Sequence, residues 1–231
     1  MKAIYKKWIL FFSLCMTVAV IACANDDATD GIEQNPDSEE VVPGKKHKVL
    51  VAYFTMPERD GVDASTGASR LVQNDTLYGH MEYVAGIIAD ETGADRFQIK
   101  TVKTYPASHH PLIEEAKEEQ NNDARPALST QIEDFDDYDV IFIGYPIWWS
   151  DMPQAMYTFF DTYDFKGKTI IPFTVHGGSG WAGTTSTIAR MEPEATMIQG
   201  YSISRNNVAA AREGVISWVR GLNLTTNTET E

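Results

Sequence analysis

The sequence predicts an α/β domain built on a parallel sheet of about five strands, with helices on both faces and a doubly wound strand order such as 2-1-3-4-5. Two apolar runs, 48–55 and 138–145, are typical of strands that are buried on both faces. Further strand-like runs alternate with segments of helical periodicity along the rest of the chain. About 175 residues remain once both ends are set aside, which suits a single domain.

The first unit of the domain is expected to be a strand, a long loop and a helix. The strand covers 48–55 and should lie at the centre of the sheet. The polar segment 56–78 has no clear period and is far longer than a usual strand-to-helix loop of about 2 to 6 residues. The helix that follows ends at the capping residue Gly93. Its buried face is marked by Met81, Val84, Ile87 and Ile88.

The alternation of strands and helices continues to Gly221. The remaining strands are expected at 96–101, 138–145, 168–175 and 196–202. A very acidic, solvated helix is expected at 111–121. Further helices are expected at 181–191 and from 208 to 221. One more helix should follow Asp151, which is a suitable N-cap, with Pro153 in the first turn.

The N-terminus predicts export and a lipid anchor. Three lysines precede an apolar run at 8–22, whose length of about 15 residues is short for a bilayer span. The run ends in Val20-Ile21-Ala22-Cys23, which resembles the lipobox of bacterial lipoproteins. We therefore expect residues 1–22 to be a signal peptide and Cys23 to be lipidated. The alternative is an uncleaved anchor with an incidental cysteine.

Domain boundaries follow from composition. Residues 23–46 are acidic and poor in large aliphatic side chains, so a flexible tether is expected before a domain at 47–222. Residues 223–231 are expected to form a disordered tail. This organisation places the domain outside the cytoplasm, anchored on the periplasmic side of a membrane or at the cell surface. Because Cys15 and Cys23 are the only cysteines, the domain itself has no disulfide and no thiolate metal site.

The charge of the chain argues against a nucleic-acid partner. The formal net charge is −14, whereas binding to nucleic-acid phosphates requires clustered lysine and arginine. A hydrophobic fraction of 43% with 11% aromatic residues is ordinary for a globular protein and argues against disorder over most of the chain.

In a doubly wound sheet, ligands bind beyond the carboxyl ends of the strands, here after the first, third and fourth strands. After the first strand come Thr55 and, later, Gly79, His80 and Met81, beside a helix N-terminus. Backbone N–H groups and the helix dipole favour a phosphate at such a position. A glycine at a helix start is also frequent for steric reasons alone, so both interpretations stay open.

The other two loops suit a flat aromatic ligand. The third strand is followed by Pro146, Ile147, Trp148 and Trp149, whose indoles either stack on a ligand or close the core. Because successive residues leaving a strand point in opposite directions, only one indole can face a ligand, and we expect Trp149 to do so. The fourth strand is followed by His176, Gly177, Gly178, Ser179 and Gly180, which either approach a ligand closely or form a flexible turn.

Other kinds of catalytic site find little support in the sequence. His109 and His110 have no zinc-type spacing around them and are expected to be solvated. Ser65, Ser69 and Ser179 lack the Gly-x-Ser-x-Gly elbow of a serine hydrolase. No metal site and no catalytic acid or base is therefore predicted.

Three segments resemble the flavodoxin-like family, in the family's order, within a match of about 49–218. They are Asp139-Val-Ile-Phe-Ile-Gly-Tyr-Pro-Ile-Trp-Trp149, Gly167-Lys-Thr-Ile-Ile-Pro-Phe-Thr174 and Gly177-Gly-Ser-Gly180. The resemblance implies the flavodoxin-like fold, an FMN cofactor and a role in electron transfer with a donor and an acceptor that the sequence does not identify. It implies that the phosphate is held by Thr55, Gly79, His80 and Met81. It implies that the flavin ring is held by Pro146, Ile147, Trp148, Trp149 and residues 176–180.

The chain also departs from the family pattern. His80 and Met81 stand where the family usually has Asn and Thr, which removes a hydroxyl from the phosphate cradle. Two alternatives to a simple electron carrier therefore stay open. One is an NAD(P)H:quinone reductase, and the other is a binding module that has kept the fold and lost FMN, which the changed cradle favours.

Overall fold

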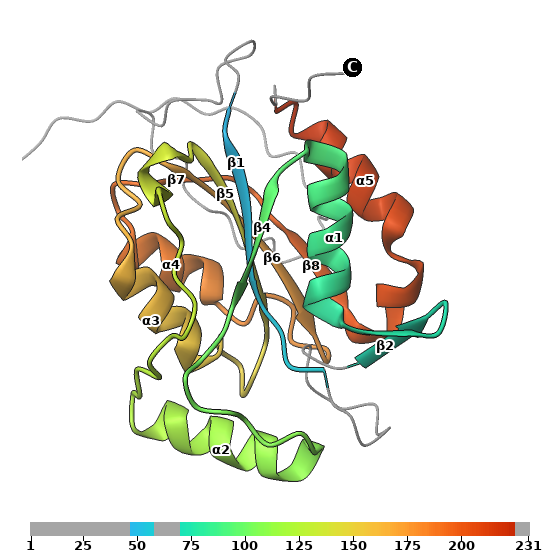
Figure 1. Cartoon of the computed structure of the whole chain (residues 1–231), viewed down its shortest axis with the longest axis vertical. Coiled ribbons are helices and arrows are strands. Elements are labelled where there is room, and N and C mark those ends of the chain that lie inside the picture. Colours follow the sequence, from blue (N-terminus) through green and yellow to red (C-terminus); the bar gives the residue numbers. More distant parts are fainter. Residues whose placement is uncertain (1–46, 58–69, 225–231) are drawn as a thin grey trace, which may run out of the picture. The chain divides into compact units, whose positions relative to one another are not determined.

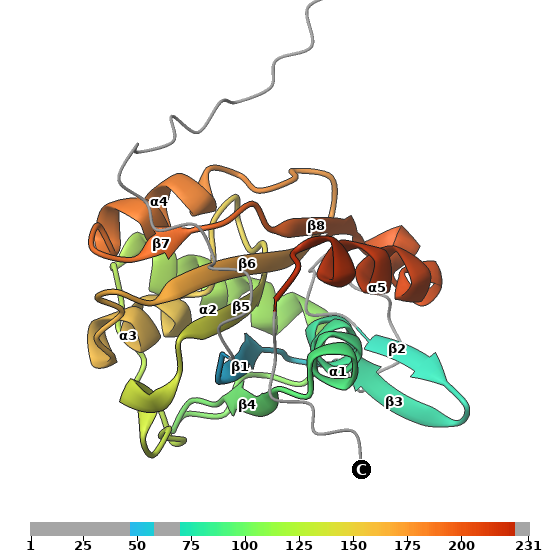
Figure 2. The same ribbon diagram turned by 90° about the horizontal axis from the view of Figure 1, so that it is seen from above.

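Helices cover both faces of a central parallel sheet (Figures 1 and 2). The computed structural model describes residues 47–57 and 70–224. The expected signal peptide, Cys23, the tether up to residue 46 and residues 225–231 lie outside the described residues. In the part of the chain that is described, no helix is both long enough and apolar enough to cross a membrane.

All strand pairs of the main sheet are parallel. Across the sheet the strands are β4 (Asp95–Ile99), β1 (Val49–Phe54), β5 (Val140–Pro146), β6 (Thr169–His176) and, both beside β6, β7 (Thr196–Met197) and β8 (Tyr201–Ser204). If a separate hairpin is left aside, β1 is first in the chain, β4 second, β5 third and β6 fourth. The predicted fold class and the doubly wound order 2-1-3-4-5 are therefore confirmed.

The two faces of the sheet carry different helices. Helices α1 (His80–Thr92) and α5 (Arg212–Gly221) cover one face, and α3 (Gln154–Thr162) and α4 (Thr184–Met191) cover the other (Figures 1 and 2). Every residue of β1 and β5 is buried, as expected for strands covered on both faces. Side chains alternate between the faces, so that Leu50 and Phe54 pack on the α3 and α4 side whereas Val51 and Tyr53 pack on the α1 and α5 side.

Helix α2 (His109–Asn121) lies at the end of the sheet where β1 and β5 finish (Figure 1). Its sequence is as acidic as predicted, but Leu112 and Ala116 are buried in the core cluster that includes Phe54 and Trp148. Two 3₁₀ segments, η1 (Phe135–Asp137) and η2 (Arg205–Ala210), complete the helical elements of the described residues.

The expected strand at 196–202 is interrupted and forms β7 and β8, which both pair with β6. The interruption lies opposite Pro172, which has no N–H to donate to a ladder. At Gly200, any side chain would overlap the carbonyl oxygen of Pro172. The strand therefore bends where a proline and a glycine backbone meet closely.

Helix α3 differs from the prediction in its cap. Asp151 does not cap it, because α3 begins at Gln154 after Pro153. The Asp151 carboxylate instead accepts the backbone N–H of Met152 at 2.8 Å and the hydroxyl of Tyr157 at 2.9 and 3.0 Å. Asp151 thus anchors the loop before the helix rather than the helix itself.

Two later helices also begin after their predicted starts. Helix α4 begins at Thr184 rather than at 181, because Ala182 and Gly183 adopt positive φ values of 51° and 77° that no helix continues. The predicted helix from 208 to 221 is divided into η2 and α5, with Val208 buried in the first and Val215 in the second.

Segment 56–78, expected to be a loop without regular structure, contains an antiparallel hairpin of β2 (Arg70–Gln73) and β3 (Thr76–Gly79). The turn residues Asn74 and Asp75 have φ values of 50° and 58°. Positive φ at both central residues is the mark of a type I′ hairpin turn, which Asn and Asp tolerate better than most residues. The hairpin projects from the base of α1 (Figure 2).

Candidate functional site

Three loops meet at the carboxyl edge of the sheet. Tyr53 of β1 is paired with Gly144 of β5, and Pro146 of β5 is paired with Val175 of β6. The segments that begin at Thr55, Ile147 and His176 therefore leave three adjacent strands at nearly the same level. Because neighbouring strands lie about 4.8 Å apart, the outer two loops start about 10 Å from each other. The sequence placed these loops correctly at the switch point between β1 and β5.

The end of β1 and the start of α1 form a small polar recess. Thr55 is 3% exposed, and its hydroxyl has no hydrogen-bond partner among the described residues. Gly79 is the N-cap of α1 and is buried, and a Cβ at this position would overlap the Oγ1 of Thr55. A buried hydroxyl without a partner beside a helix N-terminus is the arrangement that an anion would complete.

The two residues after Gly79 are both buried. His80 is 4% exposed, and Met81 is fully buried in the core between α1 and the sheet. The Met81 side chain is therefore a core residue, and only its backbone N–H is available to a ligand. The Glu82 carboxylate accepts the N–H of Gly79 at 3.2 Å, so one N–H group at this helix start already has an acidic partner.

The loop after β5 separates its two indoles. Trp148 is 5% exposed and packs edge-on against Phe54, with ring centroids 5.4 Å apart, and against Tyr105 at 5.8 Å. Trp149 is 49% exposed. Trp149 and Ser150 both have positive φ values, 51° and 60°, between reciprocal backbone hydrogen bonds of Trp148 and Asp151. This tight turn directs one indole into the core and the other to the surface.

Trp149 joins this loop to α2. Its indole Nε1 donates to the carbonyl oxygen of Ile113 at 2.8 Å, and the Nζ of Lys117 lies 5.2 Å from its ring centroid. The side chain of Gln120 donates to the backbone oxygen of Trp149 at 3.1 Å. These contacts hold a bulky residue in the left-handed region, a conformation that is costly and persists only where neighbours stabilise it.

An apolar pocket of about 230 Å³ lies between α2 and the loop after β5. It is lined by His109, Leu112, Ile113, Ala116, Ile147, Trp148 and Trp149. The Nε1 of Trp148 is buried and has no hydrogen-bond partner in the described part of the chain. The sequence did not predict the contribution of α2, and His109, expected to be solvated, is half-buried at this pocket.

The loop after β6 lies open to solvent. The N–H of Gly178 donates to the Nδ1 of His176 at 3.0 Å, and burial lowers the pKa of His176 below its ordinary value, which keeps the imidazole neutral and able to accept. Gly178 and Gly180 have φ values of 140° and 57°, which favour glycine. Gly177 and Ser179 are exposed. One of the expected N–H donors is thus used within the loop.

Residues 48–222 match the sequence model of the flavodoxin family. The chain belongs to the flavodoxin family. This membership confirms the flavodoxin-like family predicted from the sequence, and the match covers nearly all of the described residues. No curated protein sequence matches the chain.

Solved structures show the same flavodoxin fold. A candidate flavoprotein from Bacteroides uniformis is 27% identical, with a TM-score of 0.59 over 76% of this chain and 99% of that one. A second from Bacteroides eggerthii is 24% identical, with a TM-score of 0.54 over 74% and 98% of the two chains. A flavoprotein from Lactobacillus acidophilus in complex with FMN is 17% identical, with a TM-score of 0.53 over 71% and 97%.

Flavodoxin membership supports FMN as the cofactor of this chain, and the residues at the edge of the sheet fit such a group. The buried hydroxyl of Thr55 suits a phosphate. The apolar pocket, the exposed Trp149 ring and the buried Nε1 of Trp148 suit a planar aromatic system with polar atoms at its rim. None of these features requires a catalytic acid or base.

A buried pair of hydroxyls supports the loop after β6 in this flavodoxin. Tyr145 is fully buried, and its hydroxyl lies 2.9 Å from the Oγ1 of Thr184, which donates to the carbonyl oxygen of Trp181 at 2.7 Å. Because the Thr184 hydroxyl proton is used toward Trp181, the Tyr145 phenol donates to the Oγ1 of Thr184. Burial raises the pKa of Tyr145 well above its ordinary value. The sequence offered no signal for this link between β5 and the start of α4.

Proposed function

We propose that this flavodoxin-family chain binds FMN at the carboxyl edge of its sheet and transfers electrons outside the cytoplasm. The observation that carries the proposal is the buried Thr55 hydroxyl without a partner among the described residues. Thr55 lies beside a glycine N-cap and directly follows β1, the strand at the topological switch point. A hydroxyl in that position costs free energy unless a ligand completes its hydrogen bonds. An aromatic phosphate ester satisfies both this recess and the apolar pocket.

Thr55 and the first N–H groups of α1 would hold the phosphate, and residues 146–149 and 176–180 would hold the ring. FMN, when bound, supplies reversible electron transfer. The loops would orient the ring, and the apolar side chains of α2 would keep water away from it. The neutral His176 keeps the Gly178 N–H engaged, which leaves the loop in one conformation.

The visible spectrum of the purified full-length chain tests this proposal. After incubation with FMN and removal of free flavin, a yellow protein with stoichiometric flavin is the expected result. A colourless protein that also fails to quench FMN fluorescence would refute flavin binding and would favour a binding module that has lost the cofactor.

A reductase with a second aromatic substrate is the other candidate. The pocket between α2 and the loop after β5 favours it, because six of its seven lining side chains are apolar or aromatic. Such an enzyme oxidises NADH or NADPH when a quinone is added. A pure carrier shows no turnover of this kind. Steady-state oxidation of the nicotinamide, followed by its absorbance, therefore separates the two candidates.

Trp149→Ala is expected to weaken FMN binding by about 1 to 3 kcal/mol, which is the scale of a lost aromatic contact, with little change in melting temperature. Trp149 is half-exposed at the site, so its removal leaves no buried cavity. Trp148→Ala should instead destabilise the fold by about 3 to 5 kcal/mol, because Trp148 fills the core beside Phe54. FMN titrations and thermal unfolding of both variants, with Trp149→Phe as the conservative control, make the comparison. An equal or larger loss of affinity at Trp148, measured where the variant is folded, would reverse the assignment.

Anchoring by lipid at Cys23 remains part of the proposal and rests on the sequence. Metabolic labelling with a radioactive or alkynyl fatty acid should mark the wild-type chain and should fail in Cys23→Ala, because Cys15 lies in the segment expected to be removed. Cys15→Ala is the matched control and should keep its label. Label that persists in Cys23→Ala would contradict lipidation at Cys23 and would favour an uncleaved anchor that keeps Cys15.

A further inference from the structure

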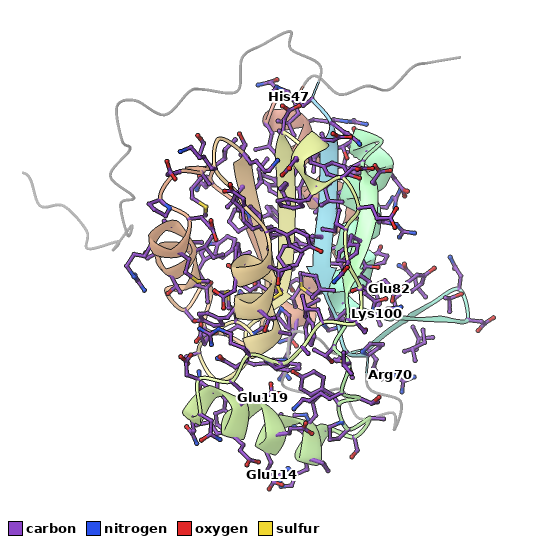
Figure 3. The ribbon with its side chains drawn as sticks, turned by 60° about the vertical axis from the view of Figure 1, so that its left-hand side comes forward. His47, Arg70, Glu82, Lys100, Glu114 and Glu119 are labelled. Carbon is purple, nitrogen blue, oxygen red and sulfur yellow. The ribbon has the colours of Figure 1, made fainter. Side chains whose placement is uncertain are left out.

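The base of the β2–β3 hairpin lies at the start of α1. β3 ends at Gly79, the N-cap of α1, and the turn residues Asn74 and Asp75 are at the opposite end of the hairpin. Arg70, the first residue of β2, is paired directly with Gly79. Figure 3 shows Arg70 at the end of the hairpin that joins the body of the domain. Arg70 is therefore next to the recess formed by Thr55 and the helix start.

The pairing also gives the direction of the Arg70 side chain. Residues directly opposite each other in an antiparallel pair project from the same face, with Cβ atoms about 4.5 to 5.5 Å apart. A Cβ on Gly79 would point into the Oγ1 of Thr55. The side chain of Arg70 therefore leaves the hairpin on the face that looks toward Thr55. The glycine opposite it keeps the intervening space open.

The surroundings of Arg70 leave part of its hydrogen-bonding capacity unused. Its Nε is shielded from solvent and has no hydrogen-bond partner among the described residues, and no carboxylate within that part of the chain forms a close ion pair with it. The acidic residue in the first turn of α1 is Glu82, whose carboxylate accepts the N–H of Gly79. A buried donor without an acceptor is unfavourable, and a charged one more so.

We infer that Arg70 binds the phosphate of the ligand held at Thr55 and the start of α1, so that the hairpin is part of the cofactor site. This inference rests on the proposed binding of FMN. The guanidinium would supply charge-assisted hydrogen bonds to the phosphate oxygens and would offset the repulsion from Glu82 and from a chain with a net charge of −14. It follows that the chain selects flavin mononucleotide over riboflavin, which carries the same ring without the phosphate.

Affinities for FMN and for riboflavin test the inference in the purified full-length chain. Arg70→Gln should weaken FMN by about tenfold to a hundredfold, the range for a charge-assisted hydrogen bond, and change riboflavin by less than about twofold. Arg70→Lys keeps the charge without the planar fork, so its affinity for FMN should lie between those of the wild type and Arg70→Gln. Arg190→Gln is the control for net charge, because Arg190 lies on α4 and donates to Thr187 on the same helix. Thermal unfolding of each apo variant shows whether it is folded.

The remaining outcomes contradict either the role of Arg70 or the proposed flavin site. If Arg70→Gln loses affinity for FMN and riboflavin equally, or if its melting temperature falls together with both affinities, Arg70 is a structural residue of the hairpin. Unchanged affinities would exclude it from the site. If the wild-type chain binds neither flavin, the proposed function fails. The inference about Arg70 then depends on inorganic phosphate, which should raise the melting temperature of the wild type and not of Arg70→Gln. No such difference would exclude an anion site.

Discussion

Replacing Gly79 with alanine is expected to weaken FMN binding by about tenfold to a hundredfold. The new methyl group would take the space of the Thr55 hydroxyl, which must turn away from the start of α1. The hydroxyl and the helix N–H groups would then no longer converge on one anion. The backbone of Gly79, with φ −75° and ψ 149°, is open to any residue, so the effect would come from the overlap and not from strain. Fluorescence titration with FMN measures it.

Gly86→Ala is the matched control, because Gly86 lies in the middle of the same helix. The nearest atom to a Cβ there is the Nη1 of Arg96 at 3.4 Å, the end of a flexible side chain. This variant should gain up to about 1 kcal/mol of stability from helix propensity and keep its affinity for FMN. In the double variant Gly79→Ala with Thr55→Ala the overlap with the hydroxyl is removed and only a close contact of 3.1 Å with the Cβ of residue 55 is left, so most of the stability should recover while affinity stays low. Wild-type affinity in Gly79→Ala would remove the phosphate from this recess.

Lys168→Met should lower the free energy of unfolding by about 2 to 4 kcal/mol and the melting temperature by about 5 to 15 °C. Lys168 is 8% exposed, and its Nζ donates to the carbonyl oxygens of Phe135 at 3.2 Å, Asp136 at 3.1 Å and Tyr138 at 2.9 Å. These carbonyls belong to η1 and its end, and the Phe135 oxygen also accepts the backbone N–H of Tyr138 at 3.2 Å. Methionine has a similar length but no donor, so three acceptors would each lose a hydrogen bond.

Lys166→Met is the control for Lys168→Met, because Lys166 lies two residues away on the surface and forms an exposed ion pair with Glu194 at 2.6 Å. A pair exposed to solvent contributes little, so this variant should unfold almost as the wild type does. Chemical denaturation of both variants at neutral pH gives the comparison. FMN affinity should be unchanged in either, since both residues lie at the end of β6 opposite to the carboxyl edge. Similar stability of the two variants would show that water replaces the ammonium group of Lys168.

The sheet could be predicted from the sequence because burial on both faces leaves a direct signal. The apolar runs at 48–55 and 138–145 correspond to β1 and β5, and the order of the remaining runs is sufficient for the doubly wound topology. The interruption at Gly200 was missed, because it depends on a contact with Pro172 of a neighbouring strand rather than on local propensity.

The loops of the candidate site were also found from the sequence, but their surroundings were not. Helix α2 was expected to be solvated because of its many glutamates, although Leu112, Ile113 and Ala116 form a short apolar stripe on one side. The hairpin at 70–79 had a local signal in Asn74-Asp75 between short β-prone runs. The place of Arg70 had none, since it follows from pairing with Gly79 and not from sequence distance.

The contact between Thr55 and Gly79 has a consequence for how the gene can change. The chain leaves the sheet at Thr55 and returns to the same point at Gly79, so everything in between is an excursion closed at its base. The entropic cost of closing such an excursion grows only with the logarithm of its length, and residues 56–78 cost about 1.5 kcal/mol more than a loop of about four residues. A change of a few residues in the length of the part before the hairpin therefore alters the free energy of folding little. Changes in its length would therefore be selected mainly through their effect on ligand binding.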